Sequence, residues 1–151
     1  MSDYLDFNSW KQGLLIGSLT GLGFIFANSV NSIFALGFPS LPVSIGAVTS
    51  FLVVGLVAPV VEEAVFRGVA LPILMQRFGK FVALFLSALV FAGFHWLVYG
   101  ASLSVSGAFI GAGIFGILAG FLALRFGLLS SIVAHSLINV SLFFGGVTLF
   151  G

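Results

Sequence analysis

The sequence contains no cysteine and very few charged residues. Without cysteine, disulfides and thiolate metal sites are excluded. Charged residues account for 6% of the chain, whereas a soluble domain averages about 25%. The formal net charge of +1 gives no reason to expect nucleic-acid binding.

Hydrophobic residues dominate the composition. They make up 60% of the 151 residues, and the mean hydropathy is +1.29. Such a composition is typical of an integral membrane protein, with nearly the whole chain in or at the bilayer. We therefore expect a single membrane domain over residues 1–151, of the all-α class.

Five apolar segments are long enough to cross a bilayer, which takes about 20 residues. They cover approximately residues 13–36, 43–75, 81–99, 103–124 and 128–150. Pro39 and Pro42 are expected to stop the first helix. The second segment is too long for one straight span, and we expect Pro59 and Pro72 to kink or end it. The sequence thus predicts a polytopic transmembrane helix bundle of about five spans.

Basic residues predict how the bundle is oriented. Lys11 precedes the first span, Arg77 and Lys80 separate the second from the third, and Arg125 separates the fourth from the fifth. With five spans, all of these residues fall on one side of the membrane. By the positive-inside rule that side is cytoplasmic, and so is the N-terminus.

Glycines recur at every fourth position in the first and fourth segments. Small residues at this spacing let helices approach closely within a membrane. We expect them to pack helices of one chain rather than to form a dimer, and the sequence predicts no oligomeric state. The glycines concerned are Gly13, Gly17 and Gly21, the pair Gly107 and Gly111, and the pair Gly116 and Gly120.

Two of the four acidic residues are adjacent, at Glu62 and Glu63, inside the second apolar segment. An ionisable residue in a membrane helix costs about 2.5–3.5 kcal/mol, so this cluster is expected to have a function. Glu63 can pair with Arg67 on one helix face, because the two are four residues apart. Glu62 lies about 100° around the helix from Glu63, so it cannot share Arg67 in the same way. A carboxylate without a close cation is suited to act as a general base. The alternative is that all three only hold neighbouring helices together.

The third and fifth spans carry the other polar candidates. His95 and His135 are the only histidines, and Ser130 and Ser131 add hydroxyl groups to the fifth span. His135 and Asn139 share a helix face, where two hydrogen-bond donors suit a developing oxyanion. Taken alone, that pair is better explained as an interhelical contact, and His95 as a packing residue. Because three spans carry polar groups, we expect one shared polar cavity, which requires the third span to tilt or its first turns to lie at the membrane interface.

The motifs Glu62-Glu63-x-x-x-Arg67, Phe91-x-x-x-His95 and His135-x-x-x-Asn139 occur in this order. The pattern resembles the CPBP family of CAAX proteases and bacteriocin-processing enzymes, also called the Abi family. The similar region runs from about residue 54 to residue 142. The resemblance implies an intramembrane endopeptidase in which Glu62 and His95 activate a water. It also implies that Glu63 and Arg67 support the site, and that His135 and Asn139 stabilise the oxyanion.

The resemblance further implies a class of substrate. Better-known members cleave prenylated proteins after the modified cysteine of a CAAX tail, and some bacterial members are linked to bacteriocin maturation or immunity. We therefore expect membrane lipid around the protein and a peptide or a prenylated protein as its substrate. The expected location is a prokaryotic plasma membrane.

Three alternatives stay open. Glu62, His95 and His135 suit a zinc ion with a water in the fourth position, but no H-E-x-x-H motif is present, and catalysis without a cofactor is favoured. A non-catalytic immunity or scaffold protein would use the same polar residues as structural contacts only. A proton-coupled transporter would also use glutamate and histidine, although the sequence shows no inverted repeat.

Overall fold

A computed structural model describes residues 10–36, 45–99 and 105–144. Within these ranges all regular structure is helical, so the predicted all-α class is confirmed for the part described. The helices are α1 (Trp10–Leu36), α2 (Ile45–Leu52), η3 (Val53–Val57), α3 (Ala58–Glu63), η4 (Ala64–Ala70), α4 (Leu71–Phe78), α5 (Lys80–Tyr99), α6 (Val105–Phe126) and α7 (Leu128–Phe144). The predicted proline stop at residues 39–42 and the last part of the fifth predicted span lie outside these ranges.

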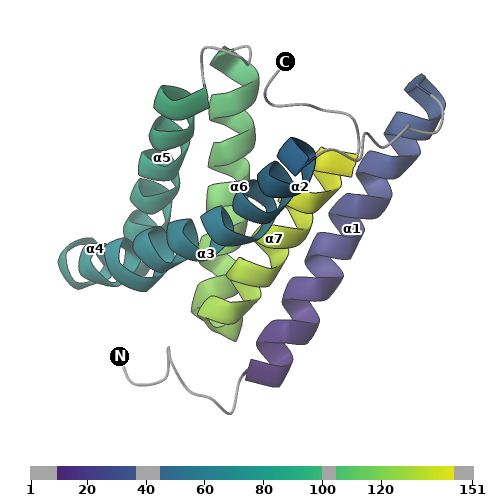
Figure 1. Ribbon diagram of the computed structural model, residues 1–151. Helices are drawn as coiled ribbons and strands as arrows, with labels where there is room; N and C mark the ends of the chain where they lie inside the picture. Colours follow the sequence, from purple (N-terminus) through teal and green to yellow (C-terminus); the bar gives the residue numbers. More distant parts are fainter. Residues whose placement is uncertain (1–9, 37–44, 100–104, 145–151) are drawn as a thin grey trace.

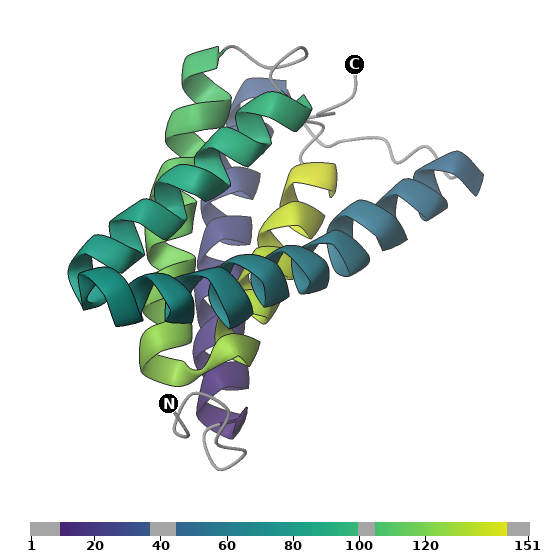
Figure 2. The ribbon, with the colours of Figure 1, turned by 90° about the vertical axis from the view of Figure 1, so that its left-hand side faces the viewer.

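The five elements from α2 to α4 follow one another directly and form one long helix over residues 45–78 (Figure 2). Neither Pro59 nor Pro72 ends it. Instead, each proline lies two residues beyond a π-helical stretch, η3 or η4. In a regular α-helix a proline ring collides with the carbonyl four residues earlier, and a wider π turn relieves that collision. The helix therefore continues through both prolines.

Two glycines make the tight turns that fold the chain into hairpins. Gly79 joins α4 to α5 with φ of 76°, and Gly127 joins α6 to α7 with φ of 86°. Glycine adopts this left-handed region without steric penalty, and it commonly ends helices there. These turns bring α4 against α5 and α6 against α7. Figure 1 also shows α5 beside α6 and α7 beside α1.

Glycines also allow these helices to approach closely. A Cβ added to Gly17 of α1 would lie 2.5 Å from the backbone oxygen of Ser130 on α7. A Cβ on Gly116 of α6 would lie 2.9 Å from Cα of Ala88 on α5. The predicted packing within one chain is thus confirmed at both positions. It is wrong for Gly111, where a Cβ would meet nothing within 4 Å among the described residues.

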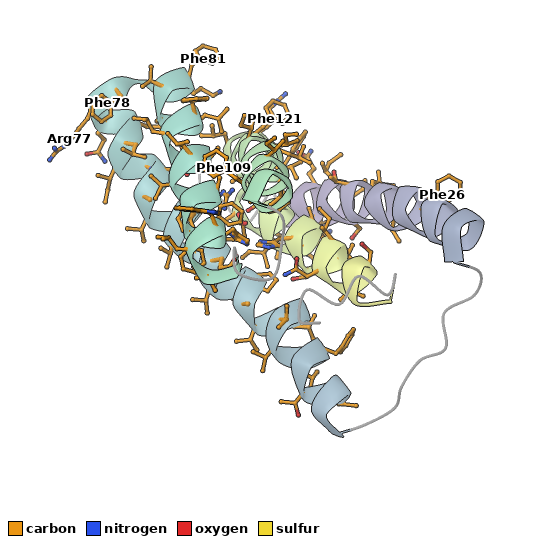
Figure 3. All side chains as sticks on the ribbon, turned by 90° about the horizontal axis from the view of Figure 1, so that it is seen from above. Phe26, Arg77, Phe78, Phe81, Phe109 and Phe121 are labelled. Carbon is orange, nitrogen blue, oxygen red and sulfur yellow. The ribbon has the colours of Figure 1, made fainter. Side chains whose placement is uncertain are left out.

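The polarity of the bundle is inverted relative to a soluble protein. Phe26 and Phe81 project outward in Figure 3 and are 73% and 84% exposed. Glu63 and Arg67, by contrast, are completely buried. Two stretches, Lys80–Val98 and Phe109–Phe126, are long and apolar enough to cross a membrane by length and composition. An apolar exterior around a polar interior is typical of membrane helix bundles.

Candidate active site

The three motif segments converge inside the bundle. Glu62 and Glu63 end α3, His95 lies on α5 and His135 lies on α7. Oε2 of Glu62 lies 3.6 Å from Nε2 of His95 and 3.8 Å from Nε2 of His135. The structure therefore brings one carboxylate and both histidines of the chain together. The meeting of the two histidines agrees with the oblique course of α5 relative to α6 in Figure 2.

Glu63 and Arg67 form a buried ion pair. Nη1 of Arg67 donates to Oε1 of Glu63 at 3.0 Å, which confirms the pairing predicted from their spacing. Nη2 donates to the carbonyl of Gly116 at 3.0 Å, so Arg67 links the long helix to α6. The guanidinium also lies 4.3 Å from the ring centroid of Phe91. Oε1 of Glu63 thus serves as a hydrogen-bond acceptor for a guanidinium that has only donors.

The hydrogen bonds at Nδ1 fix the tautomers of both histidines. Nδ1 of His135 lies 2.9 Å from Oε1 of Glu63, and Nδ1 of His95 lies 3.1 Å from the carbonyl oxygen of Phe91. Both partners are acceptors, so each Nδ1 carries a proton and donates it. In a neutral imidazole the Nε2 atom is then a bare acceptor. The two Nε2 atoms nearest Glu62 are therefore suited to accept a proton or to bind a cation.

The site has an accessible side and a buried side. The side chains of His95 and Glu62 are 20% and 12% exposed, whereas those of Glu63 and Arg67 are fully buried. His135 lies between these two sides, because it contacts Glu63 through Nδ1 and approaches Glu62 through Nε2. The side chains of Glu62 and His95 are thus partly accessible, although Oε2 of Glu62, which faces both histidines, is itself buried. The side chains of Glu63 and Arg67 are not accessible.

Aromatic rings surround the histidines. The ring centroid of Phe91 lies 4.2 Å from that of His95, and the centroid of Phe115 lies 4.6 Å from that of His135. Phe66 meets Phe91 edge-on at 5.1 Å. Sequence reasoning could not select these rings among 19 phenylalanines, although Phe91 stands in the second motif. Their packing limits the orientations open to both imidazoles and excludes water from the buried side.

Asn139 and the two serines make contacts that the sequence did not reveal. Nδ2 of Asn139 donates to the carbonyl of Val54 in η3 at 2.9 Å. Ser130 and Ser131 donate to carbonyls three residues earlier in the chain, at Gly127 and Leu128. These hydroxyl groups therefore bind backbone carbonyls at the start of α7, and neither of these hydrogen bonds involves a histidine.

The same residues also fit a metal-ligand set. One ligand atom from each of Glu62, His95 and His135 lies within 4.8 Å of the others. Metal-binding histidines usually donate their second ring N–H to a carboxylate or a carbonyl, and both histidines do so here. The donor set is therefore chemically suited to a divalent cation such as zinc.

Comparison with known proteins gives one family. The family model described as Rce1-like, type II CAAX prenyl endopeptidase, matches residues 44–141. This range contains all three motifs. Searches of curated proteins and of solved structures give no match.

Proposed function

Because the chain belongs to the Rce1-like family of type II CAAX prenyl endopeptidases, we propose that it is an intramembrane endopeptidase that hydrolyses a peptide bond within the bilayer. The family is one of proteases, and its match covers the helices that carry every candidate residue. One observation carries the proposal. Oε2 of Glu62 and Nε2 of His95 lie 3.6 Å apart, on side chains that are 12% and 20% exposed.

In this proposal Glu62 and His95 activate a water molecule together. The water would lie within hydrogen-bond distance, about 2.8 Å, of the Glu62 carboxylate and of Nε2 of His95. Oε2 of Glu62 is buried, so the partly exposed side chains of Glu62 and His95 must move to admit it. As the water attacks the scissile carbonyl, Glu62 accepts its proton and His95 orients it through the bare Nε2 atom. The protonated Glu62 then delivers the proton to the leaving amine, so the carboxylate is restored when the peptide bond breaks.

His135 and Asn139 are proposed to stabilise the oxyanion. His135 already donates its Nδ1 proton to Glu63, so it can donate to an oxyanion through Nε2 only as an imidazolium. Asn139 has two amide hydrogens, of which one binds the carbonyl of Val54 and the other can serve the oxyanion.

A zinc-dependent form of the same protease is the second candidate. It is supported by the grouping of Glu62, His95 and His135 and by the acceptors that hold each Nδ1. A bound zinc ion would supply Lewis-acid activation of water at this position. The protein residues would keep both Nε2 atoms unprotonated and oriented toward Glu62. We favour catalysis without a metal, and cleavage in the presence of a chelator distinguishes the two forms.

We further propose that the protein is one membrane domain of about five spans. The substrate would be an apolar peptide or a prenylated protein, as the family description implies. Lys11, Arg77, Lys80 and Arg125 belong to helix ends at one end of the bundle (Figure 1), which supports a cytoplasmic N-terminus. A prokaryotic plasma membrane is the proposed location.

The test is cleavage of a panel of prenylated and unprenylated CAAX peptides by the purified protein in liposomes. Products are identified by mass, and a parallel sample contains a chelator. We expect cleavage by the wild type and by Val61→Ala, whose parent side chain is 56% exposed, and loss of cleavage in Glu62→Gln. Equal cleavage by Glu62→Gln would contradict the proposal, and a folded protein that cleaves nothing in the panel would favour an immunity or scaffold role.

A further inference from the structure

The backbone carbonyl of Val54 has lost its donor within the helix. In an α-helix it would bind the N–H of Ala58, but that N–H binds the carbonyl of Val53 because η3 is π-helical. In a π-helix it would bind the N–H of residue 59, which is a proline and has none. In a membrane-spanning helix a carbonyl without a donor is costly, so a donor from elsewhere is required.

Asn139 supplies that donor from α7. Its Nδ2 atom lies 2.9 Å from the Val54 oxygen, although the two residues are 85 positions apart in the chain. The helices can approach here because the neighbouring residue is Gly55, where an added Cβ would lie 3.3 Å from a methyl group of Val140. The contact is therefore a close junction between α7 and the long helix.

This junction and the contact between His135 and Glu63 hold the same two helices together. Asn139 follows His135 by one turn of α7, and Pro59 precedes Glu62 by three residues. The two hydrogen bonds thus bracket the stretch of the long helix that ends in Glu62. A shift of either helix along the other would break one of them.

We propose that Pro59 is a positioning residue for Asn139. Because Pro59 has no N–H, the Val54 carbonyl accepts from the Asn139 amide instead, and this bond orients the amide. The proposal rests on the function proposed above, and it concerns how Asn139 is held rather than which bond is cleaved. With one amide hydrogen fixed on Val54, the side chain cannot rotate freely, and the second hydrogen keeps one direction. Preorganised donors of this kind cost no reorganisation during the reaction.

The decisive experiment is a double-mutant cycle on thermal unfolding in detergent, which needs no substrate. Pro59→Ala restores an N–H that competes for the Val54 carbonyl, so the loss of Asn139 should then matter less. We expect Asn139→Ala to lower Tm in the wild type and to lower it by less than half as much in Pro59→Ala. Pro72→Ala, the same change in the same helix, should leave the effect of Asn139→Ala unaltered. An equal fall in Tm in all three backgrounds would overturn the proposal.

A second measurement keeps the test valid if Asn139→Ala does not fold. The ¹⁵N–¹H resonances of the Asn139 side-chain amide should shift in Pro59→Ala and remain in place in Pro72→Ala. Resonances that do not move in Pro59→Ala would overturn the proposal independently. Because both readouts are structural, they can fail while cleavage persists, or hold while no peptide is cleaved.

Where cleavage is measurable, Pro59→Ala should lower kcat about tenfold and leave KM nearly unchanged. This split is expected because substrate binding does not depend on the direction of the Asn139 amide, whereas oxyanion stabilisation does. A rise in KM with an unchanged kcat would show that Pro59 shapes the substrate site instead.

Discussion

The Oε1 atom of Glu63 receives a hydrogen bond from Nδ1 of His135 at 2.9 Å and another from Arg67 at 3.0 Å. The Glu63 carboxylate therefore connects α7 to the long helix, although Glu63 and His135 are 72 positions apart in sequence. It also fixes which nitrogen of His135 is protonated. Glu63, which is fully buried, thus sets the tautomer of His135 at the candidate site.

Removing the charge of Glu63 should be strongly destabilising. Glu63→Gln leaves the guanidinium of Arg67 without its carboxylate in a fully buried position. Breaking a buried ion pair on one side typically costs about 3–5 kcal/mol. We expect a loss of this order in the free energy of unfolding, measured by reversible denaturation in mixed micelles. The double variant Glu63→Gln with Arg67→Met should lose less than Glu63→Gln alone, since no uncompensated charge remains.

Gly116→Ala should disturb the site through helix packing. The added Cβ would lie 2.9 Å from Cα of Ala88, so α6 must move away from α5 and carry the carbonyl that binds Arg67 with it. Overpacking of this kind costs about 1–3 kcal/mol. Gly111→Ala on the same helix is the control, because its Cβ would meet no atom of the described helices within 4 Å. If both variants show the same unfolding midpoint and the same cleavage rate, the close contact has no such role.

Phe91→Leu should weaken both the fold and the site. The ring is 1% exposed and contacts the guanidinium of Arg67 and the imidazole of His95. Loss of the aromatic and cation–π contacts should cost about 2 kcal/mol, measured by thermal unfolding. The matched change Phe81→Leu, at a residue that is 84% exposed, should stay within about 0.5 kcal/mol of the wild type. Equal effects of the two changes would show that the ring contacts contribute nothing specific.

The proposed orientation can be tested cleanly because the chain has no native cysteine. Single cysteines at Lys11, Arg77 and Arg125 should react with a membrane-impermeant maleimide in inverted vesicles and stay unlabelled in intact cells. A cysteine at Ser102, in the predicted loop between the third and fourth spans, should show the opposite pattern. Labelling of Arg77→Cys and Arg125→Cys from opposite sides would contradict the span arrangement.

Much of the fold can be predicted from the sequence, because the length of each apolar run and the residues that separate the runs determine where helices begin and end. The predicted spans at residues 81–99 and 103–124 agree closely with α5 and α6, since both are long apolar runs that adjoin the basic residues Lys80 and Arg125. The ion pair of Glu63 and Arg67 could also be predicted, because a spacing of four residues is a local property of a helix.

The cross-helix contacts could not be predicted in the same way. The hydrogen bond from Asn139 to Val54 depends on the π turn in η3. Predictions from helical spacing assume 3.6 residues per turn, so they do not identify a π turn. From the sequence, Pro59 predicts a kink or a helix end. Its position does not indicate that the Val54 carbonyl accepts a hydrogen bond from another helix. The bond from Arg67 to Gly116 depends on how α6 docks, which single-helix spacing does not specify.

The most direct test of the central claim is the single-turnover cleavage rate of Glu62→Gln, His95→Gln and the double variant, beside the wild type. If Glu62 and His95 activate one water as a unit, each single change should lower the rate by at least about 100-fold. The double variant should then be scarcely slower than the worse single variant, because groups that act together are not additive. Cleavage at the wild-type rate by either folded single variant would contradict the account.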